Sequence, residues 1–117
     1  MIALEPARLL KCLGDDTRLL VTLLIHREGE LCVCEMTHAL GASQPKVSRH
    51  LAQLRACELL SDRREGQWVY YRLAEGLPAW VEAVLVAAQQ GEAARLALLQ
   101  QRLAGMGNRP ERCATLC

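Results

Sequence analysis

The chain has 117 residues, of which 51% are hydrophobic, and a formal net charge of +1. This length favours one domain with a modest core. With no Phe, two Trp and two Tyr, Leu, Val and Ala must fill that core, and such a composition favours helices. Polar residues interrupt the opening MIALEPARLLKC, and no apolar run reaches membrane-spanning length. We therefore expect a cytoplasmic protein, without a signal peptide or membrane partner, whose six cysteines are core residues, metal ligands or redox-active thiols.

The first elements expected along the chain are two helices, over residues 6–13 and 17–25. Gly14 separates them, and two acidic residues then suit the start of the second helix, where the helix dipole favours negative charge. After a polar loop, a short helix is expected over residues 32–40, and Gly41 stops it.

The segment GASQPKVSRHLAQLRAC predicts a second short helix, capped by Ser43 and with Pro45 in its first turn. Helical spacing places Val47, Leu51 and Leu54 on one stripe that faces the core. The opposite face is small, polar and cationic, and carries no acid. The candidate nucleic-acid contacts on or beside this face are Gln44, Lys46, Ser48, Arg49, Gln53 and, near the edge of the core stripe, His50.

Residues 59–73 change to a strand-forming pattern around a turn at Glu65-Gly66, which predicts a β-hairpin with Arg63 and Arg64 near its tip. These two arginines are further candidate DNA contacts.

A long helix is expected over residues 78–104, weakened at Gly91, and it is apolar enough to need a partner. We therefore expect one domain over residues 1–104 and a flexible, Cys-containing tail over residues 105–117.

The order of helix, Gly-containing turn, cationic helix and basic hairpin predicts a winged helix-turn-helix, a mainly α fold with one β-hairpin. An α-helix fits the major groove of DNA, and the hairpin arginines would meet phosphate or the adjacent minor groove. Residues 43–72 carry six Lys and Arg against three acids, so this segment is +3 and the remainder −2. The pattern predicts binding to double-stranded DNA. A solvated helix face with an exposed basic turn is the alternative interpretation.

Four stretches resemble the ArsR/SmtB family of metal-responsive repressors: DDTRLLVTLL (15–24), ELCVCEM (30–36), SQPKVSRHLAQLR (43–55) and DRREGQWVYYRL (62–73). The resemblance covers roughly residues 5–90 and is closest to the arsenic-sensing branch. It implies a homodimer formed through the first and last helices. Such a repressor binds operator DNA and is released when trivalent arsenic or antimony, As(III) or Sb(III), binds. It needs no cofactor.

The resemblance also implies that Cys32 and Cys34 are the thiolate ligands of the effector. Soft ions prefer thiolate, and a helix N-terminus stabilises a thiolate. In a regular helix, however, side chains two residues apart point about 200° from each other. We therefore expect both sulfurs to reach one ion only if the first turn unwinds, which would disturb the helix before the DNA-reading helix. Two small core residues are the alternative interpretation of the pair.

Several arsenic-sensing relatives carry a third cysteine where this chain has Thr37. Cys113 and Cys117 in the tail are candidate third ligands by reach, and a small thiol or water is another possibility. Cys12 is a weaker candidate because an apolar helix carries it, and Cys57 is expected to be structural.

Other functions of the same fold stay open at this stage. The effector could be cadmium, zinc or lead, or the thiols could respond to oxidation. His26, His38 and His50 have no ligand spacing with one another, which weighs against a histidine-rich zinc site. We expect no enzyme, because no catalytic dyad or Gly-rich phosphate loop is present in the sequence.

Overall fold

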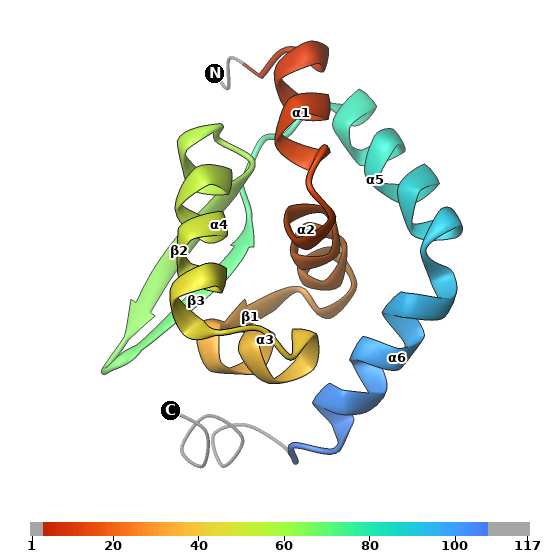
Figure 1. Cartoon of the computed structure of the whole chain (residues 1–117). Coiled ribbons are helices and arrows are strands. Elements are labelled where there is room, and N and C mark those ends of the chain that lie inside the picture. The colour runs from red at the N-terminus through yellow and green to blue at the C-terminus, as the bar shows by residue number, and fades with distance from the viewer. Residues whose placement is uncertain (1–3, 108–117) are drawn as a thin grey trace.

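Six helices and three strands make up residues 4–107, the part of the chain that this computed structural model describes (Figure 1). In chain order they are α1 (Pro6–Leu13), α2 (Asp16–Glu28), β1 (Glu30–Cys32), α3 (Val33–Leu40), α4 (Gln44–Ala56), β2 (Leu60–Glu65), β3 (Trp68–Leu73), α5 (Ala79–Gly91) and α6 (Ala93–Ala104). The predicted winged helix-turn-helix, mainly α, is confirmed: α3 and α4 form the helix pair, and β2 and β3 form the wing.

Helix α2 lies at the centre, with α4 and the sheet on one side and α5 and α6 on the other (Figure 1). Its residues 20–25 are all buried, as expected for a helix enclosed by the rest of a domain. The start of α2 is fixed by Asp15, whose side chain accepts the backbone N–H of Arg18 at 3.0 Å. The core of the domain therefore surrounds this helix.

The predicted hairpin has a two-residue turn at Gly66-Gln67, one residue later than expected. Gly66 has a φ of 61°, a conformation that favours glycine. A third strand, β1, pairs antiparallel with β3 on the edge opposite β2, giving the order β1-β3-β2. The sequence analysis missed β1, because three residues are too few to show an alternating pattern and the strand depends on pairing with β3.

The turn between α3 and α4 follows its sequence signals. Gly41 ends α3 with a φ of 63°, in the left-handed region. The Ser43 hydroxyl then accepts the backbone N–H of Lys46 at 3.3 Å, and Pro45 lies in the first turn of α4. These caps fix where the candidate DNA-reading helix begins.

The prediction of a single helix over residues 78–104 is wrong. Helices α5 and α6 are separated at Glu92, whose φ of −112° departs from helical geometry. Gly91 is a poor helix former, and the break lets Arg95 donate two hydrogen bonds, of 2.7 and 3.0 Å, to Asp16 at the start of α2. The bend therefore wraps α5 and α6 around the central helix.

Helix α6 ends at Ala104. The expected boundary between the domain over residues 1–104 and the tail over residues 105–117 is at this helix end. Cys113 and Cys117 lie outside the described residues. Within the described part of the chain, no helix combines the length and apolar character needed to cross a membrane.

Candidate functional site

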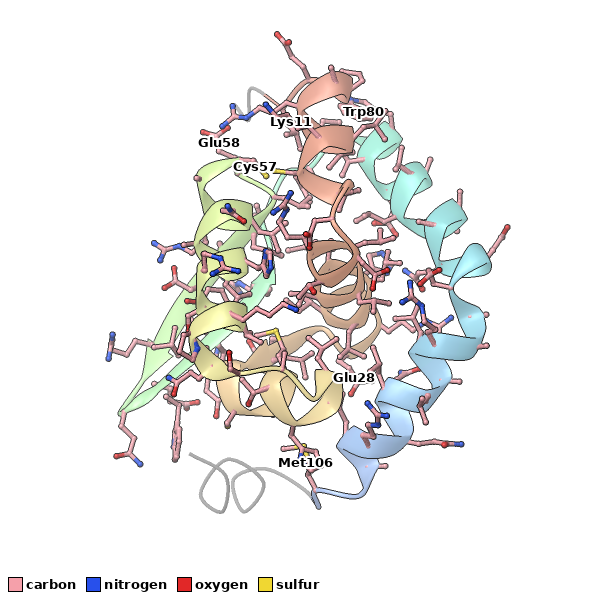
Figure 2. All side chains as sticks on the ribbon, in the orientation of Figure 1. Lys11, Glu28, Cys57, Glu58, Trp80 and Met106 are labelled. Carbon is pink, nitrogen blue, oxygen red and sulfur yellow. The ribbon has the colours of Figure 1, made fainter. Side chains whose placement is uncertain are left out.

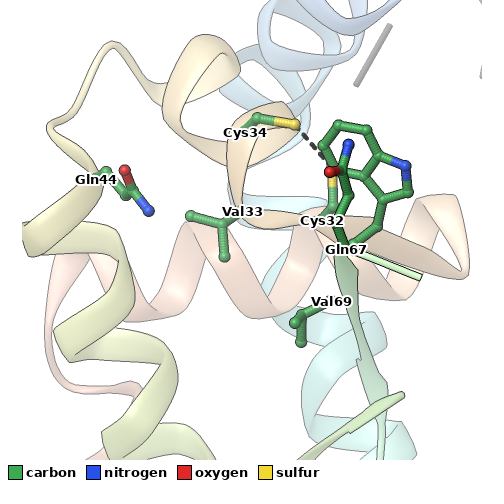
Figure 3. Close-up of a pocket in the computed structure, with 7 residues that line it drawn as sticks. Cys32, Val33, Cys34, Gln44, Gln67 and Val69 are labelled. Atoms are coloured by element: carbon green, nitrogen blue, oxygen red, sulfur yellow. Dashed lines mark hydrogen bonds between the residues drawn. The ribbon is translucent and has the colours of Figure 1, made fainter. Parts of the chain in front are cut away.

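The two cysteines of the CVC sequence lie in direct contact. Cys32 is the last residue of β1 and the N-cap of α3, with an extended backbone (φ −90°, ψ 167°), whereas Cys34 lies in the first turn of α3. Their Sγ atoms are 3.0 Å apart (Figure 3). This is longer than a covalent S–S bond of about 2.0 Å. With metal–sulfur bonds of about 2.3 Å, two sulfurs on one tetrahedral ion lie roughly 3.8 Å apart, so a small separation of the two sulfurs would let both bind a single ion.

This geometry corrects the expectation that the helix must unwind before both sulfurs reach one ion. That expectation assumes a helix that begins at residue 32 and contains both cysteines. In the structure the helix begins at Val33, and the extended backbone of Cys32 turns its side chain toward Cys34. The helix is therefore intact while the sulfurs are together.

The position of Cys32 is held from two sides. In the sheet, Cys32 pairs with Tyr70 of β3. At the helix start, its backbone N–H donates to Oε1 of Glu35 at 2.8 Å, and its side chain faces the backbone N–H of Glu35, which completes a capping box. Because Glu35 and both cysteines are buried, the fold fixes the positions of the two sulfur atoms.

A cavity of about 280 Å³ opens beside the thiol pair (Figure 3). Three elements form it: the start of α3, the start of α4 and the wing. The residues that line it are Cys32, Val33, Cys34, Gln44, Gln67, Trp68 and Val69. A ligand bound at the sulfurs would therefore be next to the first residue of α4 and to the wing.

A third protein ligand for this site is not evident among residues 4–107. The hydroxyl of Thr37 donates to the backbone carbonyl of Cys34 at 2.9 Å, so it satisfies the helix backbone. His38 is exposed, and the described residues contain no cluster of three or more His, Cys, Asp or Glu suited to a metal ion. Cys12 and Cys57 line a different cavity.

Five of the six candidate DNA contacts on α4 are exposed to solvent. Gln44, Lys46, Ser48, Arg49 and Gln53 are exposed. The core stripe of Val47, Leu51 and Leu54 is fully buried, as predicted. Within the described part of the chain, Lys46 and Arg49 form no ion pair, so their charges are available to a polyanion.

His50 is the exception, because it is 6% exposed. Its Nδ1 lies 3.3 Å from Oε1 of Gln53 and 3.5 Å from the guanidinium of Arg18 on α2, and its Nε2 lies 3.9 Å from Asp15. A side chain held in this way belongs to the contact between α2 and α4. We therefore leave His50 out of the proposed DNA interface.

The two wing arginines differ in their surroundings. Arg64 is exposed, whereas Arg63 donates to both carboxylate oxygens of Glu30, at 3.0 and 2.5 Å, and to Glu65 at 3.3 Å. The hydrogen bonds that its guanidinium donates to Glu30 raise the pKa of Arg63 further above its already high value. The guanidinium also lies 4.6 Å from the ring centre of Tyr70. Arg63 is thus partly neutralised, and Arg64 is the more accessible cation.

The sequence analysis missed the residues that connect the thiols with the wing. Tyr70 packs with both cysteines in a small buried cluster, and Trp68 packs against it. Only the three-stranded sheet places Tyr70 between Cys32 and Arg63. The signal available in the sequence was the alternation of Trp68 and Tyr70 along β3, which puts both on one face.

The fold and the site together define a winged-helix regulator of transcription that carries a buried pair of cysteines beside its DNA-reading helix. A model described as "Bacterial regulatory protein, arsR family" matches residues 15–62. The Arsenic resistance transcriptional regulator ArsR1 of Pseudomonas putida is 58% identical over 108 residues, which cover 92% of this chain and 84% of that protein. The chain belongs to the arsR family of bacterial regulatory proteins.

Two further relatives support this assignment. The Arsenical resistance operon repressor of Escherichia coli is 46% identical over 104 residues, 89% of each protein. The crystal structure of the AntR antimony-specific transcriptional repressor superposes with a TM-score of 0.60 at 31% identity, covering 74% of this chain and 76% of that one.

Proposed function

We propose that the chain is a homodimeric transcriptional repressor that leaves its operator when trivalent arsenic or antimony binds Cys32 and Cys34. One observation carries this proposal: the cavity at the thiol pair is also lined by Gln44, the first residue of α4, and by the wing. The two elements proposed to read DNA, α4 and the wing, therefore both contribute lining residues to the proposed effector site.

The chemistry of the donor atoms supports a soft effector. Thiolate sulfur favours soft ions, whereas hard cations take oxygen ligands. In their reduced forms, Cys32 and Cys34 would supply two such donors, whose sulfur atoms lie 3.0 Å apart in the structure. The names of the P. putida and E. coli relatives refer to arsenic, which supports the trivalent arsenical among soft effectors. Cys113, Cys117, a small thiol or water would complete a three-ligand site.

The proposed DNA interface consists of the exposed face of α4 and the wing. Lys46 and Arg49 would contact phosphate or base edges in the major groove, with Gln44, Ser48 and Gln53 as hydrogen-bonding partners. Arg64, and to a smaller extent Arg63, would contact the backbone beside it. A regulator that reads an operator works where the DNA is, so we propose a cytoplasmic location.

Release follows if the effector binds better to a conformation that does not fit DNA, because a ligand shifts an equilibrium only by its differential affinity. A ligand in the cavity would press on Gln44 of α4 and on Trp68 and Val69 of the wing. A small displacement at this point changes the spacing of the two DNA-reading helices in a dimer, and that spacing must match one turn of DNA.

The apolar surface supports dimerisation through the terminal helices. Among residues 4–107, the large hydrophobic side chains that remain exposed are Leu10, Val86 and Leu98, on α1, α5 and α6. Of these helices, α5 and α6 lie on the side of α2 away from the wing (Figure 1). A second copy that covers this surface would leave α4 and the wing accessible to DNA.

An operator-shift assay tests the proposal directly. The DNA is a duplex that the protein selects from a randomised library, and arsenite, antimonite, cadmium, zinc and peroxide are added in separate titrations. We expect arsenite and antimonite to release the DNA at concentrations well below those of the other agents. Release by cadmium or zinc alone, or by peroxide alone, would assign a different effector and overturn the proposal.

A further inference from the structure

A second pair of cysteines lies together at the opposite end of α4. Cys12 of α1 and Cys57, the C-cap of α4, line one cavity of about 310 Å³ with Arg8, Lys11, Arg18 and Gln53. Figure 2 shows Cys57 at this end of α4, facing α1 and close to Lys11. Cys12 and Cys57 are 45 positions apart in sequence, so only the packing of α1 on α4 brings them together. Both are free thiols, and neither takes part in the site at Cys32 and Cys34.

Hydrogen bonds fix the frame around this second pair. The Cys57 thiol donates to the carbonyl of Leu54 at 3.3 Å. Arg18 donates to the carbonyl of Cys12 at 2.7 Å, and Arg8 donates to the carbonyl of Ala56 at 2.8 Å. These bonds join α1, the start of α2 and the end of α4, so the two thiols are held in place by the fold.

The charge around the pair is positive. Arg8, Lys11 and Arg18 line the cavity, and no acid is among its lining residues in the described chain. In the described chain, the side chains of Arg8 and Arg18 contact neutral groups: backbone carbonyls, the amide of Gln53 and the ring of His50. Three cations next to two thiols favour a bound species that carries net negative charge.

We propose that Cys12 and Cys57 bind one soft monovalent cation, of the class of Cu(I) and Ag(I), in two-coordinate geometry. Each thiol loses its proton to solvent and forms one metal–sulfur bond, and no electron is transferred. The resulting dithiolate complex has a charge of −1, which the three neighbouring cations stabilise. Thiolates select soft ions of this kind.

Other uses of the pair fit the surroundings less well. Structural zinc sites take four protein ligands, and the described residues offer no cluster of three. Burial and the neighbouring Cys57 thiol raise the pKa of Cys12 to about 11. A protonated thiol reacts slowly with peroxide, because the thiolate is the nucleophile. The pair is therefore better suited to a tightly binding soft ion than to rapid oxidation.

Binding here would connect the terminal helix α1 with the end of α4. The ion would cross-link α1 to the end of α4. Since α1 belongs to the proposed dimer surface and α4 to the proposed DNA interface, this cross-link would connect the two surfaces. This inference does not depend on the effector at Cys32 and Cys34, and it is tested without them.

The experiment uses the full chain with Cys32, Cys34, Cys113 and Cys117 all changed to Ser, so that Cys12 and Cys57 are the remaining thiols. Ag(I) is titrated under argon with a competing small thiol, and native mass spectrometry gives the stoichiometry. We expect one Ag(I) per chain, bound on the order of 100-fold more tightly than in matched variants that also carry Cys12→Ser or Cys57→Ser, because the second sulfur binds intramolecularly. Equal affinity in the two-thiol and one-thiol variants would overturn the proposal.

A second measurement on the unmodified chain guards against misfolding of the multiple variant. Ag(I) is first added until the other cysteines are occupied, and one further equivalent is then added. This equivalent should slow the alkylation of Cys12 at least tenfold, as measured by peptide mass spectrometry. Unchanged alkylation of Cys12 in the presence of Ag(I) would contradict the ion site. So would formation of a Cys12–Cys57 disulfide with peroxide, seen as a loss of two mass units, if Ag(I) did not protect the pair.

Discussion

The carboxylate of Glu30 accepts two hydrogen bonds from the guanidinium of Arg63, at 3.0 and 2.5 Å. Glu30 lies at the start of β1, two residues before Cys32, and Arg63 lies on the wing. Tyr70 of β3 lies between Cys32 and Arg63, since it pairs with Cys32 on one side and its ring lies under the Arg63 guanidinium on the other. The strand that ends at the thiol pair is thus attached to the wing by charge as well as by backbone hydrogen bonds.

This attachment predicts that the two wing arginines contribute differently to DNA binding. Arg64→Ala should reduce the slope of log affinity against log salt by about one per protomer, because one phosphate contact is lost. Arg63→Ala should change that slope by less, since Glu30 already neutralises much of its charge. Fluorescence anisotropy at several salt concentrations measures both slopes. Equal changes for the two variants would show that the ion pair opens on DNA.

The Arg63→Ala variant should instead lose stability and unfold at a lower urea concentration, because a bidentate ion pair and a cation–π contact are removed. Urea unfolding measures this loss, and Arg64→Ala serves as the control with no expected change.

A second prediction concerns the face of α4. Arg49→Ala should weaken operator binding by about 1–3 kcal/mol, because Arg49 is exposed and without an ion-pair partner in the described chain. Arg55 on the same helix is the matched control: it lies 3.5 Å from Asp62, so Arg55→Ala should have a smaller effect. If the Arg55 variant loses as much affinity as the Arg49 variant, the interface extends further along α4 than proposed.

Sequence reasoning succeeded where a local pattern determines the structure. The spacing of Val47, Leu51 and Leu54 sets the buried face of α4, so its opposite face follows. The caps at Gly41 and Ser43 and the turn at Gly66 each satisfy a local backbone requirement. The helix-turn-helix and its wing could therefore be predicted from residues close together in the chain.

The features that the sequence did not reveal all depend on contacts between distant segments. Strand β1 exists because β3 offers an edge to pair with, and that pairing takes Cys32 out of the helix. The break at Glu92 depends on the contact of Arg95 with Asp16. The meeting of Cys12 with Cys57 needs the packed positions of α1 and α4. Periodicity along one segment carries no information on such contacts.

A third prediction concerns the cap of α2. The backbone N–H of Arg18 lowers the pKa of Asp15 below its ordinary value of 3.8. A carboxyl whose pKa is lower in the folded state stabilises the fold above its unfolded pKa, and this contribution is lost as the pH falls through the folded pKa. Asp15→Ala should therefore cost about 1 kcal/mol at pH 7 and less at pH 3.

Urea unfolding at the two pH values measures this difference. Asp15→Asn is the control, because Asn keeps a capping oxygen but does not titrate. A loss for Asp15→Ala that is the same at pH 3 and pH 7 would mean that the charge of Asp15 contributes nothing.

A fourth prediction concerns the missing third ligand. Cys113→Ser together with Cys117→Ser should weaken the arsenite response, because trivalent arsenic prefers three sulfur donors, but should leave operator affinity without arsenite unchanged. The measurement is the arsenite concentration that releases half of the DNA. An identical value in the doubly substituted and the unmodified chain would remove both tail cysteines from the site.

The most direct test of the account is arsenite-driven release of operator DNA from the Cys32→Ser and Cys34→Ser variants. Both residues are buried next to each other with their sulfurs 3.0 Å apart, and Ser removes the soft donor with little change in size. Cys12→Ser, in the separate cavity, is the matched control. We predict that Cys32→Ser and Cys34→Ser bind DNA normally and stay bound at arsenite concentrations that release the unmodified chain and the Cys12→Ser control. Normal release of either variant by arsenite would contradict the account.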